Sequence, residues 1–148
     1  MYFEDYEVGQ TYETPEISFT KEEIIEFGHK YDPRPIHVDE EAAKKSMFKG
    51  IIASGFQTMI GTWAQWVKMG IDMDGLICGM QIDKNIWHKP VYPGDVLKGR
   101  LTILEKIDRP GKDTGMVKNT HQIVNQKGEI VMDMFTTGLI KKKDYEVR

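Results

Sequence analysis

The sequence contains only one cysteine, Cys78, among its 148 residues. A lone cysteine excludes an intrachain disulfide framework and fits a reducing compartment such as the cytoplasm. No neighbouring residue indicates an activated thiol, so we expect Cys78 to be a small, buried packing residue. The chain must therefore be stabilised by its core, and its length is sufficient for one domain to bury such a core.

The sequence also lacks an excess of basic residues and a long apolar run. Its formal net charge is −3, and no basic stripe of the kind that binds nucleic acid is visible. We expect the tight basic cluster Lys141–Lys143 to be a solvated tail rather than a phosphate or lipid contact. Met1–Asp5 has no features of a signal peptide. The apolar stretch Gly55–Gly70 is shorter than the roughly 20 residues that span a bilayer. We therefore expect a cytoplasmic protein with no nucleic-acid or membrane partner.

The composition that is present is that of an ordinary globular protein, with 40% hydrophobic and 29% charged residues. No internal repeat, low-complexity segment or linker divides the chain. We therefore expect a single domain over residues 1–148.

The first half of the chain carries helix signals. Thr20 and Glu23 have the spacing of a capping box, and apolar residues at helical spacing follow as far as Tyr31. Pro33 ends this helix, because the residue before a proline, here Asp32, is disfavoured in the α region.

Two more helices are expected after the proline-rich segment. Asp39 can cap a short helix whose first turn is acidic. Ser54 precedes a longer helix with one broad apolar face, formed by Phe56, Met59, Ile60, Trp63 and Val67. A helix that is apolar around so much of its circumference should be buried.

The second half of the chain is expected to be β. The predicted strands are residues 76–89, 97–103, 117–124 and 130–140. Asn125–Gly128 is a hairpin signal between the last two. Consecutive strands with short turns form an antiparallel meander. The fold class is therefore α+β, with an antiparallel sheet wrapped around a long central helix.

Asp32 and His37 lie five positions apart in a segment stiffened by Pro33 and Pro35. A carboxylate and an imidazole held on one segment suit general acid–base chemistry, because histidine titrates near neutral pH. The spacing alone leaves a structural alternative open, in which Asp32 ends a helix and His37 is a polar loop residue.

Ser54 and Gly55 form a second candidate site at the start of the long helix. The first N–H groups of a helix have no partner within the helix, and the Gly55 N–H could bind an enolate or thioester oxygen. The alternative is that Ser54 only caps the helix and Gly55 is there for packing. No metal-ligand spacing is found among the four histidines, which are His29, His37, His88 and His121.

The segment Tyr31–Asp39, which reads YDPRPIHVD, resembles the D-x-N-P-x-H motif of MaoC-like dehydratases and (R)-specific enoyl-CoA hydratases. Gly50–Gly55 is similar to that family's lead into its central helix. Pro90–Asp95 is similar to its P-V-x-x-G-D turn, and Phe3–Gly9 to its opening. The four motifs occur in the family's order and cover nearly the whole chain.

This resemblance implies a hot-dog fold and a lyase that hydrates or dehydrates acyl thioesters, either acyl-CoA or acyl-carrier thioesters. Asp32 and His37 would activate the water and relay the proton, and the Gly55 N–H would hold the thioester oxygen. The resemblance implies no metal and no redox cofactor, with coenzyme A present only as part of the substrate. It also implies a homodimer or a higher even oligomer.

The resemblance places the acyl tail along the long helix, near Phe56, Met59 and Trp63. Two departures affect the substrate. Arg34 stands where hydratases often carry Asn; it could bind a carboxylate or phosphate, or point to solvent. Thr62 stands near the position of a serine that supports the catalytic aspartate in many members, and could replace it.

Two other functions remain open. A hot-dog thioesterase usually has an acid on or beside the long helix, whereas no Asp or Glu occurs in Gly50–Gly70. A non-catalytic acyl-CoA-binding or regulatory subunit would not need the Asp32 and His37 pair. Both features favour the hydratase.

Overall fold

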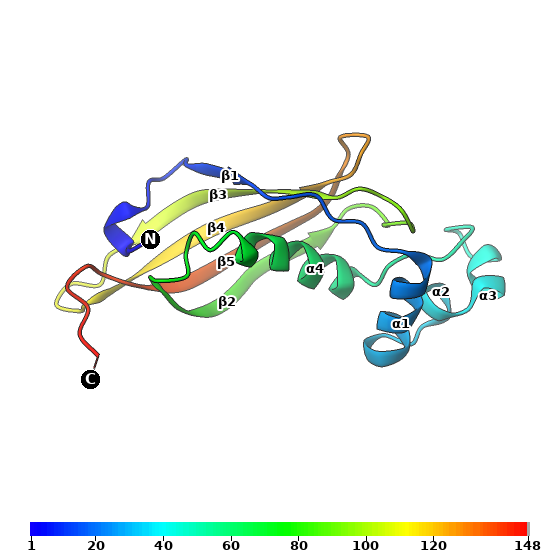
Figure 1. Cartoon of the computed structure of the whole chain (residues 1–148), viewed down its shortest axis with the longest axis horizontal. Coiled ribbons are helices and arrows are strands. Elements are labelled where there is room, and N and C mark those ends of the chain that lie inside the picture. Colours follow the sequence, from blue (N-terminus) through cyan, green and yellow to red (C-terminus); the bar gives the residue numbers. More distant parts are fainter. Residues whose placement is uncertain (148) are drawn as a thin grey trace.

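The structure is a computed structural model that describes residues 1–147, and a single antiparallel sheet forms its framework (Figure 1). Its strands are β1 (Thr11–Glu13), β2 (Leu76–Trp87), β3 (Lys98–Ile107), β4 (Thr114–Val124) and β5 (Ile130–Lys141). Their order in the sheet is β1-β3-β4-β5-β2. The helices are a 3-10 turn (Phe3–Asp5), α1 (Lys21–Tyr31), α2 (Pro35–Val38), α3 (Glu40–Lys44) and α4 (Gly55–Lys68). None of the described helices is long and apolar enough to cross a membrane.

The predicted meander is confirmed, because β3, β4 and β5 are consecutive neighbours in the sheet. Asn125 begins the hairpin turn between β4 and β5: its side-chain oxygen accepts hydrogen bonds from the N–H groups of Lys127 and Glu129. Gly128 completes the turn with a φ of +74°, a conformation that glycine adopts at little cost. The α+β class follows, with α4 lying across one face of the sheet (Figure 1).

Strand β2 forms an edge of the sheet, and in the described part of the chain it pairs only with β5. Most of its residues are exposed, including the apolar Ile77, Met80 and Ile82. Cys78 belongs to this strand and is exposed, so the expectation of a buried packing residue was wrong. The reason is its place on an edge strand, where no further strand covers it.

Helix α4 buries only part of the apolar face that its sequence suggested. Its buried residues are Gln57, Thr58, Thr62 and Trp66. Phe56 and Ile60, which belong to the predicted apolar face, are 51% and 57% exposed. Ile60 lines a cavity together with residues of β2. The predicted apolar face of α4 is therefore divided: Met59 and Trp63 pack against the core, whereas Phe56 and Ile60 are exposed.

Helices α1, α2 and α3 cluster at one end of the sheet (Figure 1). The predicted capping box of α1 is present: the Glu23 N–H donates to the Thr20 hydroxyl, and the Thr20 N–H donates to the Glu23 carboxylate. Asp39 caps α3, as expected, by accepting from the N–H groups of Glu41 and Ala42. This helical end of the molecule carries the candidate site.

Candidate functional site

Asp32 and His37 are positioned by the junction between α1 and α2. Asp32 is the C-cap of α1 and directly precedes Pro33. Pro35 is well suited to the first turn of α2, because its fixed φ matches a helix and its missing N–H is not needed there. His37 therefore lies on a short helix and is buried, at 5% exposure, and is not the polar loop residue of the structural alternative.

Gly28 explains how α2 comes so close to α1. A Cβ atom at this position would lie 2.8 Å from Cγ1 of Val38 and 3.0 Å from Cβ of His37. Both contacts are shorter than side-chain packing normally allows. The absence of a side chain at Gly28 therefore lets α2 pack on α1 and sets the position of His37.

The structure brings Asp32 and His37 together. His37 Nε2 lies 3.4 Å from Asp32 Oδ2, and His37 Nδ1 lies 2.7 Å from the carbonyl oxygen of Ile52. A carbonyl can only accept, so this hydrogen bond requires the proton on Nδ1. Neutral His37 then presents the lone pair of Nε2 beside the carboxylate of Asp32. A water molecule that donates to both acceptors fits this arrangement.

Ser54 orients the carboxylate of Asp32. The Ser54 hydroxyl donates to Asp32 Oδ2 over 2.8 Å and accepts from the Phe56 N–H over 3.3 Å. Ser54 is fully buried, so it faces the carboxylate and the helix and not solvent. Thr62 does not take the supporting role considered for it, because its hydroxyl donates to the carbonyl of Thr58 in the same helix. Ser54, at the start of the helix, makes the supporting contact that was considered for Thr62.

Gly55 is the first residue of α4, and its N–H has no acceptor within residues 1–147. The indole of Trp87 lies directly over it: a Cβ atom on Gly55 would be 2.6 Å from the ring. Trp87 Nε1 also donates to the Gly55 carbonyl over 3.0 Å. A side chain at Gly55 would displace Trp87, so glycine is required for packing and also leaves the N–H open to a ligand.

These residues line a pocket of about 360 Å³, referred to below as the dyad pocket. Asp32, His37 and Gly55 contribute to its lining, together with Arg34 and Phe56. The remaining lining includes three consecutive residues that follow or end β2, namely Trp87, His88 and Lys89. Sequence reasoning missed this second wall. The sequence feature that could have revealed this wall is its position directly before the Pro90–Asp95 turn.

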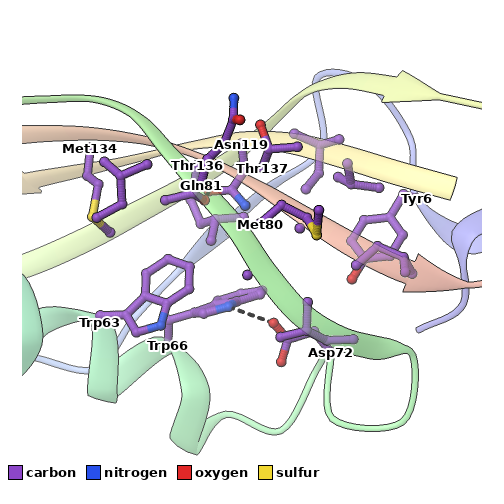
Figure 2. A pocket seen from close by; sticks show the side chains of 18 of the residues that line it. Tyr6, Trp63, Trp66, Asp72, Met80, Gln81, Asn119, Met134, Thr136 and Thr137 are labelled. Atoms are coloured by element: carbon purple, nitrogen blue, oxygen red, sulfur yellow. Dashed lines mark hydrogen bonds between the residues drawn. The ribbon is translucent and has the colours of Figure 1, made fainter.

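A second cavity of about 420 Å³ lies between α4 and the sheet (Figure 2). Met59 and Trp63 line it, whereas Phe56 lines the dyad pocket. The three residues expected along the acyl tail are thus divided between two pockets. Figure 2 shows Trp66 donating to Asp72 across the lower part of this cavity, over 3.0 Å.

His121 is a second buried histidine, located in β4 beneath α4. It is fully buried, and its ring lies edge-on to Trp63 at a centroid distance of 5.6 Å. Neither of its ring nitrogens has a hydrogen-bond partner within the described residues. Burial alone lowers the pKa of His121 to about 4, because the charged form is poorly solvated there.

The comparisons first define the fold class. A Mycobacterium tuberculosis protein described as having a double hot-dog fold superposes with a TM-score of 0.80, at 14% identity, over all of this chain and 46% of its own. The five-stranded antiparallel sheet with α4 across one face is therefore a hot-dog fold, as predicted.

The family follows from the sequence itself. The MaoC-like domain model matches residues 4–126, and the chain belongs to this family. A MaoC-like dehydratase from Rhodospirillum rubrum has a TM-score of 0.89 and 27% identity, over 98% of this chain and 99% of its own. A protein from Archaeoglobus described as a monoamine oxidase regulatory protein has a TM-score of 0.90 and 28% identity, over 97% and 95%. An uncharacterized Bacillus subtilis protein, YdeM, is 35% identical over 96% of this chain and all of its own length. The family supports a hydratase or dehydratase in general.

Proposed function

We propose that this protein reversibly adds water to the 2,3 double bond of an enoyl thioester, of the enoyl-CoA type. The observation that carries the proposal is the approach of His37 Nε2 to Asp32 Oδ2, 3.4 Å apart, in a pocket that also contains the unbonded N–H of Gly55. This addition needs two elements: an acid–base pair that activates the water, and a hydrogen-bond donor for the thioester carbonyl oxygen.

The proposed reaction starts with a water molecule that donates to Asp32 and His37. Its oxygen bonds to C3 of the substrate while one of its protons passes to the pair. The electrons of the double bond move toward the thioester carbonyl, and the Asp32 and His37 pair then delivers the proton that it took from water to C2. Water is thus added across C2 and C3 without cleavage of the thioester. Ser54 and the Ile52 carbonyl support the step by fixing the orientation of the carboxylate and the imidazole.

Gly55 would stabilise the charge that develops on the thioester oxygen. Its N–H is at the N-terminus of a helix of 14 residues, where unpaired N–H groups and the helix dipole favour negative charge. The chemistry proposed here uses side chains, this N–H and the substrate thioester. We therefore propose no cofactor besides the coenzyme A of the substrate.

The site can be tested by following two signals in one reaction. With an enoyl-CoA substrate, the ultraviolet absorbance of the conjugated double bond should fall while free thiol stays at background. Product made in heavy water should carry deuterium at C2. Thiol release that matches or exceeds the loss of absorbance, and that Asp32→Asn abolishes, would assign the site to a thioesterase. Neither signal across a panel of enoyl-CoAs would favour a non-catalytic subunit.

We also propose that the protein forms a homodimer or a higher even oligomer through β2. This strand has one unpaired edge and exposes Ile77, Met80 and Ile82, features that invite pairing with a second copy. Trp87, at the end of the same strand, lines the dyad pocket, so assembly would also stabilise the site. Light scattering should therefore give a multiple of 17.1 kDa at micromolar concentration, and a stable monomer would contradict the proposal.

A further inference from the structure

The dyad pocket contains more basic than acidic side chains. Arg34, His88 and Lys89 line it, and Asp32 is its one acidic lining residue among the described residues. His88 is paired with Asp133 at 2.8 Å and Lys89 with Glu129. Neither Asp133 nor Glu129 is among the lining residues of the pocket.

Arg34 is the cation with the most free hydrogen-bonding capacity. Its Nε lies 3.6 Å from Asp32 Oδ1, and its side chain is 77% exposed. The guanidinium makes no hydrogen bond to any described residue. Its fork of N–H groups is thus available at the pocket and has the geometry that binds a carboxylate through two parallel hydrogen bonds.

The location of Arg34 restricts which anion it can bind. Asp32 uses Oδ2 toward His37 and Ser54, and its other oxygen, Oδ1, faces Arg34. An anion on Arg34 would therefore lie beside the reacting carbons. The phosphates of coenzyme A are separated from those carbons by the full length of the pantetheine arm. A carboxylate on the acyl group itself fits the position better.

We infer that the substrate is a short enoyl thioester with a second carboxylate near its double bond, and that Arg34 is the residue that selects it. This inference rests on the proposed hydratase function. Such an acyl group is small enough for the dyad pocket, so it would not use the apolar cavity beneath α4.

The test compares two substrates that differ at one group. One is trans-but-2-enoyl-CoA, and the other carries a carboxylate in place of the terminal methyl group. The wild-type protein should prefer the carboxylate substrate, measured as the ratio of the two kcat/KM values from absorbance loss. Arg34→Gln should lower this ratio by about 10- to 100-fold, the usual effect of losing a charged bidentate contact. Arg34→Lys, which keeps the charge but not the fork, should fall in between.

The ratio separates selection from a general effect on Asp32, because such an effect would change both rates alike. Arg100→Gln is the matched control: Arg100 is exposed on β3 and does not line the pocket, so the ratio should not move. The same pair of acyl groups is also measured as N-acetylcysteamine thioesters, which have no phosphate. The effect of Arg34→Gln on the ratio should persist in them.

Three results would count against the inference, and they differ from failure of the proposed function. A wild-type preference for the methyl substrate would overturn the inference and leave the hydratase intact. An Arg34→Gln defect on both CoA thioesters that disappears with both N-acetylcysteamine thioesters would assign Arg34 to a phosphate. An unchanged ratio in Arg34→Gln would remove its role in selection. Hydration of none of the substrates would instead reject the proposed function itself.

Discussion

The molecule buries two histidines in two different ways. At the helical end, His37 donates from Nδ1 to a carbonyl and has a carboxylate 3.4 Å from Nε2. Beneath α4, His121 is fully buried beside Trp63, and neither of its ring nitrogens has a partner in residues 1–147. Both side chains are buried, at 5% and 0% exposure, yet only His37 has its proton position determined by neighbours.

This difference teaches that burial and a shifted pKa do not by themselves mark an active residue. His121 has a strongly lowered pKa because it is desolvated, and burial alone accounts for the shift. His37 is the candidate for catalysis because it has an orienting partner, an acidic neighbour and an accessible pocket.

The largest effect is expected at the pair itself. Asp32→Asn and His37→Ala should each lower hydration by about 10²- to 10⁴-fold, the usual contribution of a positioned acid–base group. Both variants should remain folded, since a lost hydrogen bond costs about 1–3 kcal/mol of a total stability of about 5–15 kcal/mol. Enoyl-CoA absorbance gives the rate, and circular dichroism checks the fold. Near-wild-type activity in a folded variant would disprove the assignment.

The next effect concerns His121 and the pH dependence of stability. The unfolded chain binds a proton at this side chain below its ordinary pKa of 6.5, whereas the native state does so only near pH 4. Stability should therefore fall as the pH drops through this range, by about 3 kcal/mol from this group. His121→Leu should remove that part of the pH dependence and should not impair hydration at neutral pH.

Denaturant titrations across this pH range measure the effect. His29→Gln is the control, because His29 is exposed and its loss should leave the pH dependence unchanged. An acid sensitivity that survives His121→Leu in full would show that other groups cause it.

Gly28→Ala should affect the helical end alone. The added Cβ would overlap Val38 and His37, so α2 must shift and carry the imidazole away from Asp32. We expect a loss of activity of about 10- to 100-fold, because a small displacement of a reacting group is costly. Gly50→Ala is the matched control, since a Cβ at Gly50 would meet no atom within 4 Å. Equal activity of the two variants would mean that the α1–α2 contact does not position His37.

The smallest effect is expected for Thr20→Ala, which removes the N-cap of α1. It should lower the free energy of unfolding by about 1 kcal/mol, with little change in rate, because Thr20 is at the other end of the helix from Asp32. Thermal unfolding measures the loss, and Thr20→Ser, which keeps the hydroxyl, should restore stability. A large change in rate would instead tie the helix start to the chemistry.

Local signals predicted much of this molecule. The capping box at Thr20, the stop at Pro33, the Asn125–Gly128 hairpin and the meander depend on residues close in sequence, and each is present. The approach of Asp32 to His37 was also predictable, because few residues separate them and prolines restrict the segment.

Features that depend on distant pairing were not predictable in this way. The exposure of Cys78 follows from the position of β2 at the sheet edge, which no local pattern specifies. Which residues of the apolar face of α4 are buried depends on how the helix packs against the sheet. Trp87 contacts Gly55 although they are 32 positions apart in sequence, so the residues around one of them do not predict the contact with the other.

The hydrogen bond from Ser54 to Asp32 has a consequence for how this chain can change. One hydroxyl both begins the central helix and orients the carboxylate, so a substitution at Ser54 is felt by folding and by chemistry together. Selection for stability alone could accept an aspartate or asparagine cap at this position, but an aspartate would set a second negative charge against Asp32. Few substitutions at Ser54 therefore leave both stability and activity unchanged. Variants selected by directed evolution should retain this serine while their surface residues change.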